Sequence, residues 1–210
     1  MSGNYYTAEQ LLKESINTLQ VTKEVANKYS INIAASYNYI GELRLISGDY
    51  QDAIEKFKEA ISLSLNKNAL SALSIFYINL GKAYYITDQI EEAEKEFKLA
   101  YSLYGDFDSF WKRSMLDSYM ALNQIKLKNY EEAKKYIDYA EKFSSTMHDP
   151  RDLGVVNFAL YQIAKETENN KELREVFKDK LTKETLHYKE KAIEYLDEHI
   201  DVYELNILNA

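Results

Sequence analysis

The chain has 210 residues, of which 46% are hydrophobic and 29% are charged, and its formal net charge is −8. This length allows a substantial buried core, and six Gly and one Pro are too few for a Gly- or Pro-rich linker. The negative charge argues against direct nucleic-acid binding, and a sequence without Cys excludes disulfides, cysteine-based zinc sites and thiol chemistry.

No apolar run approaches the roughly 18 residues that a membrane span requires. Residues 1–20 also lack the basic and apolar regions of a signal peptide. We therefore expect a cytoplasmic protein. Because few turn-forming residues interrupt the chain, we also expect it to be almost entirely helical.

The N-terminal segment resembles a later part of the same chain. Residues 2–16 read S-G-N-Y-Y-T-A-E-Q-L-L-K-E-S-I and overlay residues 47–61, S-G-D-Y-Q-D-A-I-E-K-F-K-E-A-I, position by position. This match predicts that residues 1–29 form a half repeat, which starts at the second helix of a pair. Two interpretations are open: the segment is an N-terminal cap, or the chain is a piece of a longer protein. We favour the second interpretation.

Residues 47–61 carry the pattern around which the rest of the chain is organised. Gly48 and Asp49 form a break and a helix N-cap, and the following apolar residues fall on one helical face. Small, bulky and small residues at Ala53, Phe57 and Ala60 favour close approach of a second helix. The same spacing returns with a period of 40 residues at Ala93, Phe97 and Ala100, and again at Ala133, Ile137 and Ala140.

This periodicity predicts a series of helical hairpins. We expect about four helical pairs, over residues 31–66, 70–104, 109–146 and 152–182, the last of them degenerate. Residues 183–210 are expected to form one further helix that caps the open end of the stack. Its buried face is predicted to carry Leu186, Ile193, Leu196 and Ile200.

The second pair contains the clearest motif, which comprises Tyr77, Leu80, Gly81 and Tyr84, followed by Ala93, Phe97 and Ala100. It resembles the tetratricopeptide pattern W-x2-L-G-x2-Y…A-x3-F, with Tyr77 in place of Trp. The first pair departs from the pattern at Arg44, and the third at Asp117 and Gln124. The resemblance extends over residues 2–182. It implies an all-α fold, a right-handed α-solenoid of tetratricopeptide-like hairpins that forms a single domain over residues 1–210.

In the tetratricopeptide family the first helix of each pair lines a concave groove. The register then nominates a peptide-binding groove that consists of Asn38, Tyr39, Glu42, Ile78, Asn79, Lys82, Tyr85, Tyr119 and Asn157. Asn can donate and accept hydrogen bonds to a peptide backbone, and Tyr and Ile supply contact area. The alternative is that these side chains serve packing between helices, with Asn79 bound to a neighbouring helix and the tyrosines packed between helices.

Other functions find little support in the sequence. The dicarboxylate clamp by which some tetratricopeptide proteins hold chaperone tails needs positive charge, and its positions hold Asn38, Glu42, Asn79, Met115 and Tyr119. The three histidines, His148, His187 and His199, lack metal-ligand spacing. No phosphate-binding loop or catalytic triad motif is evident. We therefore expect neither an enzyme nor a cofactor or metal.

The repeat length, the composition and the amide-rich groove resemble the peptide-sensing tetratricopeptide domains of Firmicute quorum-sensing regulators, the Rap, NprR and PlcR group. This resemblance implies a short peptide or protein segment as ligand, and a role as the regulatory part of a transcriptional or signalling regulator. The alternative is a constitutive interaction scaffold, or an adaptor that self-assembles, for example as a homodimer, through its open N-terminal edge.

Overall fold

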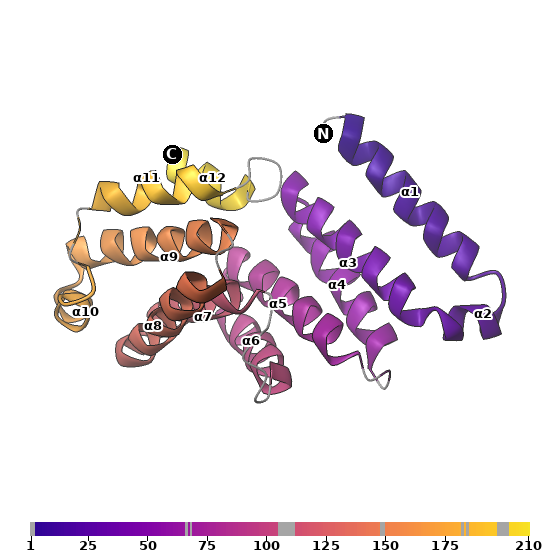
Figure 1. The fold of residues 1–210 in the computed structure, drawn as a ribbon, viewed down its shortest axis with the longest axis horizontal. Coiled ribbons are helices and arrows are strands. Elements are labelled where there is room, and N and C mark those ends of the chain that lie inside the picture. The colour runs from indigo at the N-terminus through magenta and orange to yellow at the C-terminus, as the bar shows by residue number, and fades with distance from the viewer. Residues whose placement is uncertain are drawn as a thin grey trace. The chain divides into compact units, whose positions relative to one another are not determined.

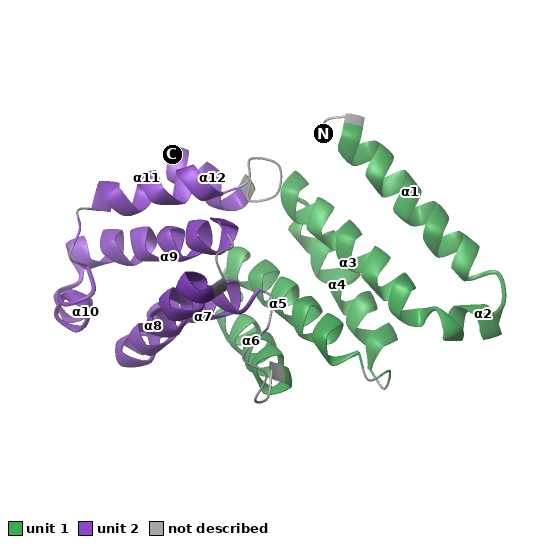
Figure 2. Ribbon diagram, viewed as in Figure 1, with its two compact units in different colours: residues 1–109 green, residues 110–210 purple. Residues whose placement is uncertain are grey.

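The computed structural model describes residues 3–65, 67, 69–104, 112–147, 150–181, 183, 185–196 and 202–210 (Figure 1). These residues form twelve helices and no strand, which confirms the all-α prediction. None of the described helices is long and apolar enough to cross a membrane. Contacts divide the chain into two compact units, residues 1–109 and residues 110–210 (Figure 2). The single domain expected over residues 1–210 stays a prediction.

Unit 1 contains six helices. They are α1 (Gly3–Leu19), α2 (Lys23–Lys28), α3 (Ser30–Ser47), α4 (Tyr50–Ser64), α5 (Leu70–Ile86) and α6 (Ile90–Tyr104). Helix α3 packs along α4 and α5 packs along α6, so the first two helical pairs are confirmed. Helix α4 also packs against α5, which stacks one pair on the next.

Each pair in unit 1 is closed by a glycine on the first helix and a phenylalanine on the second. A Cβ atom at Gly41 would lie 2.5 Å from the Phe57 ring, and one at Gly81 would lie 2.5 Å from the Phe97 ring. Both rings are completely buried. The two helices therefore approach closely only because the first helix has no side chain at this point.

The turn before α4 is formed by Gly48, whose φ of 79° lies in the left-handed region that glycine favours. Asp49 occupies the N-cap position of α4, as predicted, but its side chain makes no capping hydrogen bond.

The N-terminal half repeat packs against the first helix of the first pair. Helix α1 lies against α3, where Ile16 joins a buried cluster with Ile33 and Ile40. Leu11, on another side of α1, is 62% exposed. The short helix α2 follows and was not predicted. It is capped by Thr22, whose hydroxyl oxygen accepts a hydrogen bond from the backbone N–H of Val25 at 3.2 Å.

Unit 2 also contains six described helices. They are α7 (Arg113–Lys126), α8 (Tyr130–Met147), α9 (Pro150–Asn169), α10 (Lys171–Phe177), α11 (Thr185–Tyr195) and α12 (Val202–Asn209). Helix α7 packs along α8, as expected for the third pair. Helix α10 has only seven residues but buries Leu173 and Phe177 completely. The main partner of α9 is α11.

The C-terminal segment differs from the single capping helix that was predicted. It forms two helices, α11 and α12, and the buried side of α11 carries Tyr188 and Ala192, with Leu196 following. Leu186 and Ile193 are 57% and 40% exposed, so the predicted face was wrong for these two residues. Ile200 lies outside the described residues.

The reason for this difference lies on α9. A Cβ atom at Gly154 would lie 3.0 Å from a side-chain carbon of Leu196 and 3.0 Å from the Leu196 backbone. The end of α11 therefore meets α9 at a point where only glycine leaves room. This contact selects the face that carries Tyr188, Ala192 and Leu196, which are spaced four residues apart, one helical turn.

Candidate functional site

The nominated groove residues of unit 1 are called the wall of unit 1 below, and those of unit 2 the wall of unit 2. The wall of unit 1 is organised around Asn79 on α5. Its side-chain nitrogen donates to Oδ1 of Asn38 on α3 and to Oε1 of Glu42 one turn further along α3, both at 2.9 Å. Asn38 and Asn79 are buried, with exposures of 4% and 3%. Both amide hydrogens of Asn79 are therefore used inside the protein, and a bound peptide would have to replace one of these bonds to receive a hydrogen bond from this side chain.

The other nominated residues of unit 1 differ in their exposure. Ile78 and Lys82 are buried, whereas Tyr39 is 55% exposed. Glu42 and Tyr85 are half-buried. The accessible part of the predicted wall in unit 1 therefore consists of Tyr39, Glu42 and Tyr85, which lie on the first helices α3 and α5 as the register predicted.

The two nominated residues of unit 2 are both engaged within that unit. The hydroxyl of Tyr119 on α7 donates to Oε1 of Glu204 on α12 at 2.5 Å, and both residues are completely buried. The side-chain nitrogen of Asn157 on α9 donates to the backbone oxygen of Leu153, one turn earlier, at 2.8 Å. Tyr119 is thus covered by a part of the same chain, which the sequence reasoning did not anticipate.

Arg44, which replaces a motif tyrosine in the first pair, connects three helices. Its Nη2 donates to Oε1 of Glu9 on α1 at 2.5 Å, and its Nε donates to Oδ2 of Asp52 on α4 at 2.6 Å. Lys13 also contacts Oε1 of Glu9, at 2.6 Å. The hydrogen bond from Lys13, together with the charge of Arg44, holds the pKa of Glu9 below its usual range. The departure from the motif therefore attaches the half repeat to the first full pair.

Asp117, which replaces a motif aromatic residue in the third pair, is a completely buried carboxylate. Arg113, one turn earlier on α7, donates from Nε to its Oδ2 at 2.8 Å, while Oδ1 has no hydrogen-bond partner among the described residues. Burial raises the pKa of Asp117 to about 7, although the charge and the hydrogen bond of Arg113 act in the opposite direction. The sequence reasoning noted the departure but did not identify Asp117 as a titrating group.

A cavity of about 780 Å³ lies in unit 1, beside α2, and contains none of the nominated residues. It is lined by Gln20, Lys23, Glu24, Ala26, Asn27, Ser30, Ile33, Ser62, Leu63 and Lys67. Ile33 lies one turn after Ser30, so both point from the same side of α3, whereas Tyr39 points from another side. The cavity was missed because α2, which forms one of its sides, was not predicted.

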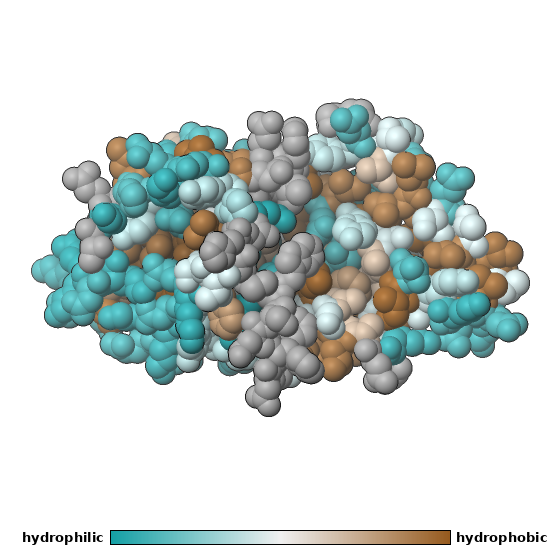
Figure 3. All heavy atoms as spheres, in the orientation of Figure 1, coloured by the Kyte–Doolittle hydropathy of each residue, from teal (hydrophilic) through white to brown (hydrophobic). Residues whose placement is uncertain are grey.

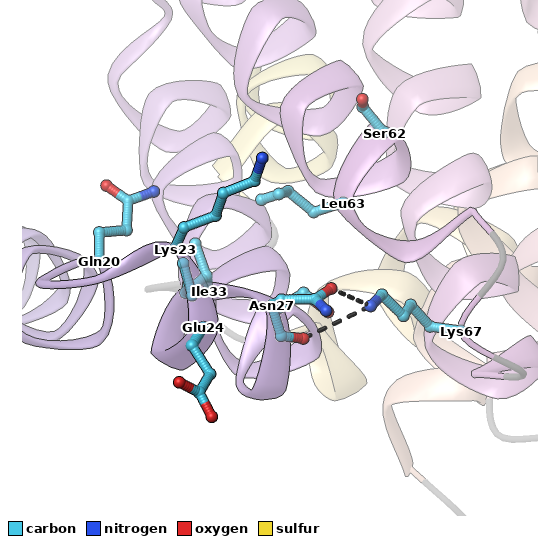
Figure 4. Close-up of a pocket in the computed structure, with 10 residues that line it drawn as sticks. Gln20, Lys23, Glu24, Asn27, Ile33, Ser62, Leu63 and Lys67 are labelled. Carbon is cyan, nitrogen blue, oxygen red and sulfur yellow. Dashed lines mark hydrogen bonds between the residues drawn. The ribbon is translucent and has the colours of Figure 1, made fainter.

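Figure 4 shows how the charged residues lie around this cavity. Lys67 extends toward α2, where its Nζ donates to Oδ1 of Asn27 at 2.6 Å and to the backbone oxygen of Asn27 at 3.4 Å. Lys23 extends toward Leu63, and the carboxylate of Glu24 points away. Two ammonium groups beside the apolar side chains Ile33 and Leu63 suit a ligand that combines a carboxylate with an apolar group.

Apolar side chains are exposed mainly in unit 1. Figure 3 shows them gathered over the helices of unit 1, while unit 2 is more hydrophilic on the same face. The described residues of unit 1 that contribute large exposed apolar side chains are Tyr6, Leu11, Val21, Tyr29, Tyr39, Leu65, Leu70 and Leu99. Unit 1 is therefore the richer of the two in surface that a protein or peptide partner can bury.

Within the described ranges, no three His, Asp or Glu side chains come together as metal ligands. His148 and His199 lie outside these ranges.

Comparison with known proteins identifies the repeat. A family model of the tetratricopeptide repeat matches residues 75–107, which span most of α5 and all of α6, so the chain contains a tetratricopeptide repeat. No curated protein matches the sequence at a significant level.

Two solved structures have a similar fold. The apo form of RapI has 13% sequence identity and a TM-score of 0.66, over 91% of this chain and 77% of RapI. BtubC from P. vanneervenii has 16% identity and a TM-score of 0.64, over 99% of this chain and 76% of BtubC. At these identities the likeness shows the fold alone. Together with the packing of adjacent helix pairs, it identifies the fold as a tetratricopeptide-like α-solenoid.

Proposed function

We propose that this chain is a protein- or peptide-binding module and that its ligand lies against the first helices of unit 1. The observation that carries the proposal is the hydrogen-bonded row of Asn38, Asn79 and Glu42 on the first helices α3 and α5, where α3 also exposes Tyr39. The hydrogen bonds fix the side-chain rotamers before a ligand arrives, which lowers the entropy cost of binding. A carboxylate accepts several hydrogen bonds at once, so Glu42 suits the N–H groups of an extended peptide.

The finer proposal is that the module is the regulatory, ligand-binding part of a bacterial signalling or transcriptional regulator with quorum-sensing function. The fold likeness to RapI supports it. On this proposal the chain is not an enzyme, and its net charge of −8 leaves direct nucleic-acid contact to other parts of such a regulator.

The proposal is tested with a phage-displayed library of random heptapeptides. Peptides selected on the full chain are synthesised with a fluorescent label, and their dissociation constants are measured by anisotropy. Tyr39→Ala is expected to weaken binding by about tenfold, because an exposed aromatic anchor carries a large share of such an interface. The matched control is Tyr139→Ala on α8, where the ring is 44% exposed. Selected peptides that bind wild type and Tyr39→Ala equally well would overturn the assignment of this wall.

The cavity beside α2 is the competing location for the same function. If the selected peptides bind the wall of unit 1, Lys23→Gln is expected to leave their dissociation constants unchanged. A strong loss of affinity for Lys23→Gln without any loss for Tyr39→Ala would assign the ligand to the cavity, where a peptide carboxylate would contact Lys23.

The constitutive scaffold and the self-assembling adaptor are the alternatives. For a sensor, a selected peptide must change amide hydrogen exchange beyond the residues that it contacts, whereas for a scaffold protection is confined to them. Self-assembly is favoured by the exposure of Tyr6 and Leu11 on α1, both 62%. Sedimentation of wild type and Leu11→Glu measures it, since a homodimer through α1 would dissociate in the variant.

A further inference from the structure

The C-terminal helix α12 is a short element that buries two side chains completely. It has eight residues, and two of its described side chains, Glu204 and Leu208, are completely buried. They are one turn apart and therefore share one side of the helix. Tyr203, Leu205 and Ile207 are half-buried, and Asn206 and Asn209 are exposed. Helix α12 lies against α9 and α11.

The buried carboxylate of α12 is bound by a residue of the predicted ligand wall. Glu204 accepts the hydrogen bond of the Tyr119 hydroxyl at 2.5 Å, across 85 residues of sequence. In the 40-residue register Tyr119 corresponds to Asn79, which in unit 1 is satisfied by the neighbouring first helix α3. In unit 2 the equivalent wall position is instead satisfied by a separate C-terminal segment.

The energetics favour a segment that can leave. A helix of eight residues is marginal by itself in water, so packing must hold it in place. Of its two completely buried side chains, Glu204 carries a carboxylate. Removal of a carboxylate from water costs free energy that a hydrogen bond offsets only in part. Ser118, next to Tyr119, is also completely buried, and its hydroxyl has no hydrogen-bond partner among the described residues. One completely buried hydroxyl beside Tyr119 in the sequence is thus without a hydrogen-bond partner in the described part of the chain while α12 is in place.

We propose that the wall of unit 2 around Tyr119 is a binding site for a short amphipathic helix that carries a carboxylate one turn before a leucine, and that α12 occupies this site as a displaceable intramolecular ligand. The partner that competes with α12 is a helical protein segment of the same chemistry. The proposal concerns unit 2 and does not require that the wall of unit 1 binds a peptide. Its failure and the failure of the proposed function are therefore distinguishable.

The first test measures amide hydrogen exchange in the unmodified full chain. A displaceable α12 opens without unfolding unit 2, so its amides are expected to exchange at least tenfold faster than those of the central turns of α9. Tyr119→Phe, which removes only the hydroxyl, is expected to speed exchange in α12 further and to leave α8 unchanged. Protection of α12 equal to that of α9, in the wild type, would overturn the proposal.

The second test supplies the helix in trans. The probe is a fluorescein-labelled synthetic peptide of residues 202–210, titrated with full-length chain. In wild type α12 competes with the probe, whereas in the double variant Glu204→Lys, Leu208→Lys the site is open. The probe is expected to bind this variant at least tenfold more tightly than wild type. The matched control is Asn206→Lys, Asn209→Lys, which places the same charges on exposed positions.

The specificity of the site is read from altered probes. A probe with Gln in place of Glu204 is expected to bind the open variant about tenfold more weakly, and Tyr119→Phe in the open variant is expected to reduce this difference. An open variant that keeps its helical circular dichroism and does not bind the probe overturns the proposal. If the open variant unfolds, hydrogen exchange in the unmodified chain still decides the question.

Discussion

Arg44 on α3 and Glu9 on α1 form a charge pair at two positions that hold Tyr and Ile one pair later. Their side chains meet at 2.5 Å, with exposures of 17% and 6%. In the repeat overlay Glu9 corresponds to Ile54, and Arg44 corresponds to Tyr84 one pair later. Both departures from the pattern thus occur together at one contact, and they join the half repeat to the first full pair.

Replacement of Arg44 alone is expected to destabilise unit 1. Arg44→Tyr leaves the buried carboxylate of Glu9 with Lys13 as its remaining ion-pair partner among the described residues, and we expect a loss of about 2 kcal/mol in the free energy of unfolding. The double variant Glu9→Ile, Arg44→Tyr introduces the residues found one pair later. It should lose less free energy of unfolding than Arg44→Tyr alone. Urea unfolding of the two single variants and the double variant gives the coupling energy. Additive losses would show that the two positions do not interact.

Asp117 is expected to make stability depend on pH in the opposite direction from an ordinary paired carboxylate. Its pKa in the folded state is raised to about 7 from the ordinary value of 3.8, so the folded chain holds this proton more tightly than the unfolded chain. Its contribution to stability is therefore present at acid pH and is lost as pH rises from about 4 to about 7. At about 1.4 kcal/mol per pKa unit, the loss is at most about 4 kcal/mol.

Asp117→Asn removes this dependence, so its stability relative to wild type should rise between pH 5 and pH 8. Urea midpoints at several pH values measure the difference. Asp179→Asn, at an exposed carboxylate, is the control and should follow the wild-type profile. Parallel profiles for wild type and Asp117→Asn would contradict the raised pKa.

Gly81→Ala tests the close approach of α5 and α6. The added Cβ would lie 2.5 Å from the Phe97 ring, and we expect a loss of about 1–3 kcal/mol because the packed pair has no room for it. Phe97→Leu also destabilises, by creating a cavity, but in the double variant the methyl group partly fills that cavity. The cost of Gly81→Ala should therefore shrink or change sign in the Phe97→Leu background. Thermal or urea unfolding measures both, and an unchanged cost would show that Phe97 is not the limiting contact.

Asn79→Ala separates the packing role of this residue from its proposed role in ligand binding. Removal of the amide takes one hydrogen-bond donor away from buried Asn38 and one away from half-buried Glu42, and we expect a loss of about 2 kcal/mol in the free energy of unfolding. Asn157→Ala should cost less than about 1 kcal/mol, because Asn157 is half-buried and binds a backbone carbonyl of its own helix. Urea unfolding gives both values. Equal costs for the two substitutions would contradict the structural role assigned to Asn79.

The helical pairs were predictable because their signal is local and periodic. The spacing of Ala53, Phe57 and Ala60, repeated every 40 residues, locates second helices and the face that each buries. Gly81 and Phe97 also show which two helices pair. A position without a side chain on one helix faces a ring on the other, and this combination specifies a close contact. The match of residues 75–107 to a tetratricopeptide repeat falls on this stretch.

The candidate site was predictable only as a set of positions. The register placed Asn79 and Tyr119 on first helices, but it did not show that Asn79 is engaged by Asn38 and Glu42, or that Tyr119 is covered by Glu204. The cavity beside α2 gave no signal, because it is formed by a short helix outside the repeat pattern. The prediction of the buried face of α11 was also wrong in part, because a contact with Gly154 on another helix, α9, selects this face.

The sequence by itself therefore determined the helices of the first three pairs, their pairing and the face that each second helix buries, because a helical turn relates residues only three or four positions apart. The tertiary structure decided which distant segment supplies the hydrogen-bond partner of Asn79 and of Tyr119. Glu204 reaches Tyr119 across 85 residues, and no periodic pattern encodes such a contact. Whether a polar side chain is available to a ligand depends on these long-range neighbours, and only the folded chain brings them together.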